Sequence, residues 1–226
     1  MGIVNGYLEP DLSSAVLLTI DAQRDFTLPG APAEISGTAE VVPGMRRLVR
    51  AFRQSNRPVV HVVRLYRPDG SNVDLCRRYD AERGKCVVLP ETDGAELVDD
   101  LKPSPQVRLD AGSLLDGGLQ QIGPSEWIMY KPRWGAFYRT PLEEHLRDLH
   151  ANTVVVCGCN FPNCPRASIY DASCRDFRLV LAEDAVSGLR ERDRAELENI
   201  GVSLLRSAAV VEMVRDAAGS AAASTP

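Results

Sequence analysis

Three reactive side chains follow short apolar runs of the sequence. Asp21 comes directly after AVLLTI, Lys131 directly after EWIMY, and Cys164 closes the loop that follows NTVVVC. A cysteine sulfur can attack an electrophilic carbonyl carbon and form a covalent intermediate that water then hydrolyses. Asp21 would accept the thiol proton and return it to the leaving amine, while Lys131 would keep Asp21 ionised. These residue types predict a hydrolase that works through an acyl-enzyme, provided that the fold brings them together.

Each of the three residues also has a simpler interpretation. Asp21 could cap the turn after its strand, Lys131 could be a solvated surface lysine, and Cys164 could be a small buried apolar residue. The combination favours chemistry, because a thiol at a helix N-terminus and beside a lysine is shifted towards the thiolate. None of the five other cysteines combines a loop position with a following helix start. We therefore predict Cys164 as the nucleophile.

The elements that must position these residues are indicated by apolar periodicity. The runs that we interpret as strands are 15–20, 58–63, 127–130, 153–157, 179–182 and, more weakly, 209–214. Helical patterns cover 42–53, 142–149, 167–175 and 192–205. Continuous apolar runs that alternate with helices predict a parallel sheet covered on both faces. Ligands of such sheets bind beyond the carboxyl ends of the strands, where the three reactive residues would meet. We expect the Pro- and Gly-rich segment 64–125 to form functional loops.

Composition limits the classes of protein that this chain can be. The 226 residues are 44% hydrophobic and 25% charged, as in ordinary globular proteins, and we expect one domain over 1–216 and a disordered tail over 217–226. With 26 Lys and Arg against 31 Asp and Glu, the net charge is −5, and no basic cluster favours a nucleic-acid or membrane partner. No apolar stretch is long enough for a bilayer span and no basic leader begins the chain. These features predict a cytoplasmic protein with six reduced cysteines.

Three segments resemble the motifs of the isochorismatase-like cysteine hydrolases. VLLTIDAQRDF resembles the family's first strand followed by D-x-Q-x-D-F, and YKPRWGAFYRTPLEEHL resembles its K-x-x-x-x-A-F-x-x-T-x-L block. VVVCGCNFPNCPRASIYDASCRDF resembles the third block, a strand, then G-x-x-x-x-x-C, then a helix. The three blocks occur in the family's order between about residues 14 and 214. Three ordered blocks are a far more specific signal than any one of them.

The resemblance implies a three-layer α/β/α fold with a six-stranded, mostly parallel sheet, assembled as a homodimer or homotetramer. It also implies a catalytic triad of Asp21, Lys131 and Cys164. A cis peptide bond between Cys159 and Asn160 would direct the backbone N–H groups of Asn160 and Cys164 towards the oxyanion.

Departures from the family pattern narrow the expected reaction. The family's nicotinamidases bind a divalent metal through an aspartate and histidines after the second strand, whereas HVVRLYRPDGSN has no D-x-H here. We therefore expect no metal and no other cofactor, and core or surface roles for His61, His145 and His150. The family's vinyl-ether-cleaving isochorismatases lack the nucleophilic cysteine, so its presence favours C–N hydrolysis of a small amide, carbamoyl, ureido or lactam substrate.

Residues that flank the triad segments are candidates for the substrate pocket. The aromatic candidates are Phe26, Trp134, Phe137 and Tyr138, and the polar candidates from the segment 64–125 are Asn72, Arg67 and Arg77. Core packing is an equally good explanation for the aromatic residues. The arginines would recognise a carboxylate or else lie in solvent.

Three alternatives stay open on the sequence alone. The chain could hydrolyse an ether through Asp21 without the thiol, in which case activity would survive Cys164→Ala. It could be a non-catalytic relative that keeps the fold as a binding module. It could also be a redox-active protein that uses Cys157, Cys159 or Cys164, which reversible disulfide formation would reveal.

Overall fold

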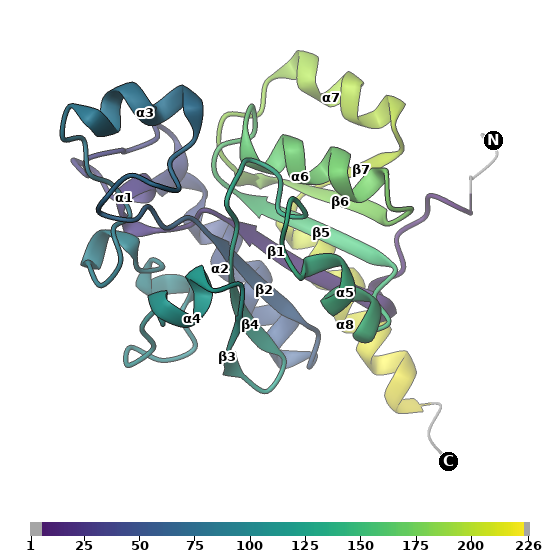
Figure 1. The fold of residues 1–226 in the computed structure, drawn as a ribbon. Helices are drawn as coiled ribbons and strands as arrows, with labels where there is room; N and C mark the ends of the chain where they lie inside the picture. Colours follow the sequence, from purple (N-terminus) through teal and green to yellow (C-terminus); the bar gives the residue numbers. More distant parts are fainter. Residues whose placement is uncertain (1–5, 224–226) are drawn as a thin grey trace.

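Within residues 6–223, which a computed structural model describes, seven strands form one sheet in the order β3-β4-β2-β1-β5-β6-β7 (Figure 1). The strands are β1 (Ala15–Ile20), β2 (Val59–Val63), β3 (Leu119–Gly123), β4 (Glu126–Tyr130), β5 (Thr153–Gly158), β6 (Arg178–Val186) and β7 (Val202–Leu205). Neighbouring strands are parallel except β3, which runs antiparallel to β4. The predicted α/β fold is confirmed, with seven strands instead of the expected six.

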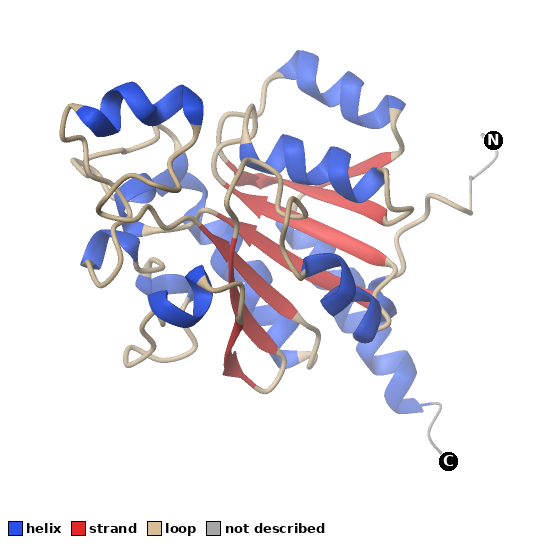
Figure 2. Ribbon diagram, in the orientation of Figure 1, coloured by secondary structure: helices blue, strands red, loops and turns tan. Residues whose placement is uncertain are grey.

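Helices cover both faces of the sheet (Figure 2). They are α1 (Arg24–Thr27), α2 (Thr38–Gln54), α3 (Leu75–Glu82), α4 (Ala111–Leu115), α5 (Leu142–Asp148), α6 (Cys164–Ser173), α7 (Glu191–Asn199) and α8 (Ser207–Ala223), with short 3-10 turns at Leu12–Ser14, Asp93–Ala95 and Asp99–Leu101. No helix in the described part of the chain combines the length and apolarity that crossing a membrane requires.

Two apolar cores lie on the two faces of the sheet, and β1 shows how one strand serves both. Successive side chains of a strand point to opposite faces. Leu18 and Ile20 therefore pack into the core beneath α5, α6 and α7, whereas Leu17 packs into the core beneath α2 and α8. Every residue of β1, β2 and β5 is buried. This burial on both sides explains the unbroken apolar runs of the sequence.

The segment 64–125 contains more structure than its composition predicts. A third apolar cluster lies under it and includes the fully buried Leu65, Leu97 and Leu114. The loop 66–88 is closed at its base, because the N–H of Tyr66 donates to the carbonyl of Val88 (3.2 Å) and the N–H of Val88 donates to Oδ2 of Asp25 (2.6 Å). Helix α3 lies within this loop and has no buried residue.

The C-terminal region corrects three of the sequence-based expectations. The weak strand expected over 209–214 is part of α8, where Val210 and Val214 are buried on one face of the helix against the core of α2. The final strand, β7, lies instead at the end of the helix expected over 192–205. The tail 217–226 is helical through residue 223, because its alanines have the highest helix propensity of all residues. Residues 224–226 lie outside the described residues.

A buried polar chain connects the centre of the sheet to α2. Oγ1 of Thr19 lies 2.7 Å from Nδ1 of His61, and Nε2 of His61 lies 2.7 Å from Oε1 of Glu126. Arg53 of α2 donates to both oxygens of Glu126, at 2.5 and 2.6 Å. Burial opposes ionisation of Glu126, but hydrogen bonds from Arg53 and His61 outweigh it and lower the pKa of this carboxyl to about 2. The polar chain therefore stabilises the fold only while Glu126 is ionised.

Glu126→Gln is expected to weaken the acid sensitivity of the fold. Because the pKa of Glu126 is about 2 in the folded state and 4.5 when unperturbed, its contribution is complete above pH 4.5 and is lost as the pH falls towards 2. The loss amounts to about 2 kcal/mol of unfolding free energy between pH 6 and pH 3. Urea unfolding at the two pH values measures it, with the exposed Glu212→Gln as the matched control. An unchanged pH dependence in Glu126→Gln would contradict the assignment.

Candidate active site

Asp21 and Lys131 lie beyond the carboxyl ends of two strands of the sheet. The N–H of Asp21 donates to the carbonyl of Val62 (2.9 Å), and the N–H of Lys131 donates to the carbonyl of Val63 (3.0 Å). Both residues therefore continue the strand pairing by one step past β1 and β4. Asp21 has φ of 50°, a left-handed conformation that costs an L-residue on the order of 1–2 kcal/mol. Such strain at the end of a strand is typical of functional positions.

The turn after β5 carries Cys164 to the same edge. Gly158 has φ of 124°, and a Cβ at this position would lie 2.2 Å from the carbonyl oxygen of Ile20, so only glycine fits. Next to it, the N–H of Cys159 donates to that same carbonyl (2.9 Å). Cys164 is then the first residue of α6. The expected cis bond between Cys159 and Asn160 is wrong, because residues 6–223 contain only trans peptide bonds.

The structure brings the three predicted catalytic side chains together. Nζ of Lys131 donates to Oδ2 of Asp21 at 2.8 Å and to Sγ of Cys164 at 3.3 Å. Lys131 is fully buried, and Asp21 and Cys164 are only 4% and 6% exposed. Charges at such depth interact strongly because little water screens them. One ammonium thus contacts both a carboxylate and a thiol.

The thiol is the resting form of Cys164. Burial, and after it the negative charge of Asp21, raise the pKa of Cys164 to about 12 against the lowering by Lys131 and Arg64. The helix start and the lysine, which favour a thiolate on their own, are therefore outweighed by desolvation. The expectation of a thiolate-favouring site is wrong in this respect. The proton must leave Cys164 during the reaction, and the carboxylate of Asp21 is bound to the same ammonium as the thiol.

Two backbone N–H groups at the start of α6 have no hydrogen-bond partner among residues 6–223. Within the described residues, the N–H groups of Asn160 and Cys164 donate to no acceptor. Asn160 also accepts a hydrogen bond at Oδ1 from Nδ2 of Asn163 (3.0 Å), which holds the turn. Free backbone donors beside a nucleophile are the usual components of an oxyanion hole. The assignment of these two groups to that role stays a prediction.

A small pocket joins these groups and contains two of the predicted aromatic residues. Phe26 and Trp134 line it together with Asp21, Asn160 and Cys164. Its cavity volume is about 10 Å³, which is room for about one water molecule. A substrate can enter only if a wall side chain moves.

Three other predicted pocket residues lie elsewhere. Phe137 is 5% exposed and packs against Phe177, with 6.0 Å between ring centroids. Tyr138 is 46% exposed and lies under the guanidinium of Arg139. Asn72 donates to the carbonyl of Leu65 (2.8 Å) and to the Tyr130 hydroxyl (3.0 Å), so its amide holds the loop 66–88. Phe137 and Tyr138 are close to Lys131 in the sequence, but their side chains do not line the pocket.

Arg64 is a pocket residue that sequence reasoning missed. It is 3% exposed and lines the pocket directly after β2. Its guanidinium contacts Oδ2 of Asp74, which also accepts from the Tyr66 hydroxyl (2.9 Å). Tyr66 lines the pocket too. Ile35 and Cys159 also line it. A polar residue directly after a buried strand was the available signal for Arg64.

Gln23, the glutamine of the D-x-Q pattern, has a structural role next to the pocket. Its Oε1 accepts from the N–H of Arg64 (2.7 Å), and its Nε2 donates to the carbonyls of Arg64 (2.7 Å) and Ala95 (2.6 Å). The fully buried amide thereby joins the ends of β1 and β2 to the returning part of the segment 64–125. Gln23 positions the pocket wall, and Asp21 two residues earlier supplies the reactive carboxylate.

The histidines do not gather around the pocket. His61 belongs to the polar chain with Glu126, and the His145 ring packs edge-on against Trp127, with 4.6 Å between centroids. Across residues 6–223, no three His, Cys, Asp or Glu side chains converge in a way that could hold a metal ion. Metal independence stays a prediction that activity measurements must test.

The chain is similar to known proteins along most of its length. A family model of the isochorismatase domain matches residues 15–110 and 112–212. A protein of Arabidopsis thaliana named a probable inactive nicotinamidase is 30% identical over 195 residues, covering 84% of this chain and 90% of that protein. The ureidoacrylate amidohydrolase of Methylobacterium radiotolerans is 25% identical over 210 residues, covering 84% of this chain and 74% of that enzyme. The crystal structure of an isochorismatase family protein from Desulfovibrio vulgaris has a TM-score of 0.75 and 30% identity, covering 89% of this chain and 98% of that chain.

Proposed function

Because this chain belongs to the isochorismatase family, we propose that it is a metal-independent cysteine amidohydrolase. It cleaves a C–N bond in a small amide, carbamoyl, ureido or lactam compound. Among the relatives, the similar proteins of Methylobacterium radiotolerans and Pseudomonas putida are named amidohydrolases, whereas the one of Arabidopsis thaliana is named a probable inactive nicotinamidase. The observation that carries the proposal is the contact of Nζ of Lys131 with both Asp21 (2.8 Å) and Cys164 (3.3 Å).

In the acylation step, the sulfur of Cys164 attacks the substrate carbonyl carbon and a C–S bond forms. The thiol proton passes to Asp21, whose Oδ1 is buried and has no hydrogen-bond partner. The N–H groups of Asn160 and Cys164 bind the oxyanion, at roughly 3–4 kcal/mol for each donor. The C–N bond then breaks, and the proton on Asp21 moves to the nitrogen. The nitrogen leaves as ammonia or an amine, or, in an opened lactam, stays attached to the acyl group as a free amine.

In the deacylation step, water attacks the carbonyl carbon of the thioester and gives a proton to Asp21. The C–S bond breaks, the acid product leaves, and the proton returns from Asp21 to the sulfur of Cys164. The ammonium of Lys131 balances whichever of Asp21 and Cys164 carries the negative charge at each stage. The buried position of the ammonium strengthens this effect.

Ammonia or amine release from a panel of small amides, ureido acids, carbamoyl compounds and lactams tests the proposal. We expect the wild type and Cys174→Ser to hydrolyse one class, and Cys164→Ser to hydrolyse none. Cys174 is the matched control because it is an exposed cysteine at the opposite end of α6. Intact-mass spectrometry of quenched turnover should show an acyl group on Cys164. Dialysis against EDTA should leave the rate unchanged.

The ether-cleaving and non-catalytic alternatives predict different results in the same assay. Hydrolysis of a vinyl ether that survives Cys164→Ser would indicate chemistry by Asp21 without the thiol. A wild-type protein that releases product from no member of the panel and never carries an acyl group would favour a non-catalytic relative.

A further inference from the structure

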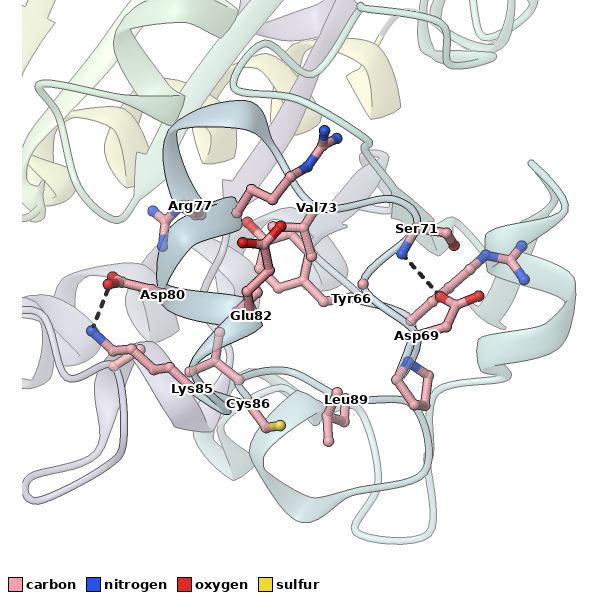
Figure 3. A pocket seen from close by; sticks show the side chains of 17 residues that line it. Tyr66, Asp69, Ser71, Val73, Arg77, Asp80, Glu82, Lys85, Cys86 and Leu89 are labelled. Atoms are coloured by element: carbon pink, nitrogen blue, oxygen red, sulfur yellow. Dashed lines mark hydrogen bonds and ion pairs between the residues drawn. The ribbon is translucent and has the colours of Figure 1, made fainter.

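Arg77 connects helix α3 to the catalytic pocket. Of the eight residues of α3, only Arg77 lines that pocket, in which Asp21 and Cys164 lie. It also lines a larger cavity of about 370 Å³ beside α3, shown in Figure 3, so it stands at the border between the two spaces. Its Cζ lies 5.2 Å from the centroid of the Trp134 ring. Stacking on an indole holds a guanidinium in place and leaves its N–H edge available.

The guanidinium of Arg77 lacks an acceptor. Its Nε is buried and has no hydrogen-bond partner, and no carboxylate of residues 6–223 forms an ion pair with it. A buried donor without an acceptor is destabilising by about 1–3 kcal/mol. A ligand that brings an acceptor to this position would remove that cost.

The other two cations at the pocket are already paired. Lys131 contacts Asp21 at 2.8 Å, and Arg64 contacts Asp74. Among the charged residues that line the pocket (Asp21, Arg64 and Arg77), Arg77 is the one without a partner of opposite charge. The pocket therefore has an excess of one positive charge, although the whole chain has a net charge of −5. The local excess is complementary to an anion.

We propose that Arg77 binds a carboxylate of the substrate, so that the substrates are small amide, carbamoyl or ureido compounds with an anionic group near the scissile bond. This inference rests on the proposed function and specifies its substrate class. A guanidinium can pair with both oxygens of one carboxylate, which gives direction as well as affinity. A neutral analogue leaves the guanidinium unpaired, so the analogue binds more weakly than the carboxylate.

Two alkylating reagents that differ only in charge test Arg77 without any knowledge of the substrate. The sulfur displaces iodide from the CH₂ carbon of either reagent, which leaves a carboxymethyl group from iodoacetate and a carbamoylmethyl group from iodoacetamide. Peptide mass spectrometry gives the rate at Cys164, with the exposed Cys174 as the internal reference. We expect the iodoacetate-to-iodoacetamide rate ratio at Cys164 to fall at least tenfold in Arg77→Gln. Arg83→Gln is the matched control, because Arg83 also carries a charge at α3 but lines neither space.

An equal ratio in wild type and Arg77→Gln, or an equal fall in Arg83→Gln, would overturn the proposal. If neither reagent modifies Cys164, the nucleophile of the proposed function is in doubt, and Arg77 is then judged by binding alone. Calorimetric titration of Cys164→Ala with N-carbamoylglycine and with its neutral amide serves this purpose. Arg77→Gln should weaken binding of the acid at least tenfold and leave the amide unaffected. No binding of the acid by Cys164→Ala, or equal binding in both backgrounds, would also overturn it.

Discussion

Asp21→Asn is expected to lower kcat by roughly 10⁴-fold and, at the same time, to accelerate alkylation of Cys164. The amide cannot accept the thiol proton, so acylation loses its base. The negative charge of Asp21 is one of the causes that raise the pKa of Cys164. Without it, the ammonium of Lys131 faces the sulfur alone, and the pKa of Cys164 falls. Unfolding would also expose the buried Cys164 and lower activity, so the comparison requires a urea unfolding curve showing that Asp21→Asn is folded under the assay conditions.

Rates of turnover and of iodoacetamide modification at pH 8 measure both effects. Cys174 again provides the internal reference for alkylation, since it is exposed. Asp176→Asn is the matched control, because Asp176 is exposed and has φ of 59°, a conformation that asparagine adopts as readily. If alkylation of Cys164 slows in Asp21→Asn, the charge of Asp21 does not govern the thiol and the assigned role fails.

Lys131→Met is expected to reduce the free energy of unfolding by about 3–5 kcal/mol and to abolish turnover. The substitution leaves the carboxylate of Asp21, only 4% exposed, without its cationic partner. For a chain of this size the loss corresponds to a melting temperature lower by roughly 6–20 °C. Lys85→Met is the control, because the Lys85 ammonium lies 3.6 Å from Asp80 at the surface, where an ion pair contributes about 0–1 kcal/mol.

The double variant Asp21→Asn/Lys131→Met separates stability from catalysis. It removes both charges of the pair, so most of the lost stability should return while activity does not. Thermal unfolding and urea unfolding of the four proteins give the coupling energy between the two residues. A melting temperature of Lys131→Met equal to that of the wild type would show that the pair is not held as the structure describes.

The parts of the fold that the sequence predicts are those with strong local patterns. β1, β2 and β5 are buried on both faces, and their unbroken apolar runs predict this burial. β3 escapes prediction because it is an edge strand with every residue at least partly exposed, and it has no such run. Ala209 to Val214 has the β-branched residues of a strand, yet packing of one face against α2 makes it helical. Tertiary packing overrides local preference at such places.

The candidate site was predictable where one strand end carries one reactive residue. Asp21 and Lys131 follow from that rule. Cys164 required a second signal, the helix start that follows it, because Cys159 is the cysteine nearest the end of β5. The pairing of Arg64 with Asp74 does not, because it depends on how the loop 66–88 folds back over the pocket. The charge state of Cys164 was also beyond the sequence, since a helix start favours the thiolate and only the burial of the sulfur reverses the balance.

The closed base of the loop 66–88 has an evolutionary consequence. One backbone hydrogen bond between Tyr66 and Val88, together with the Asp25 carboxylate, separates this loop from the frame that carries the catalytic groups. Doubling the length of a loop costs only about 0.6 kcal/mol in closure entropy. Insertions, deletions and exchanges in α3, none of whose residues is buried, can therefore accumulate at little cost to folding. Proteins that evolve from such a chain can acquire new substrates through sequence changes in α3 while they keep the same catalytic residues.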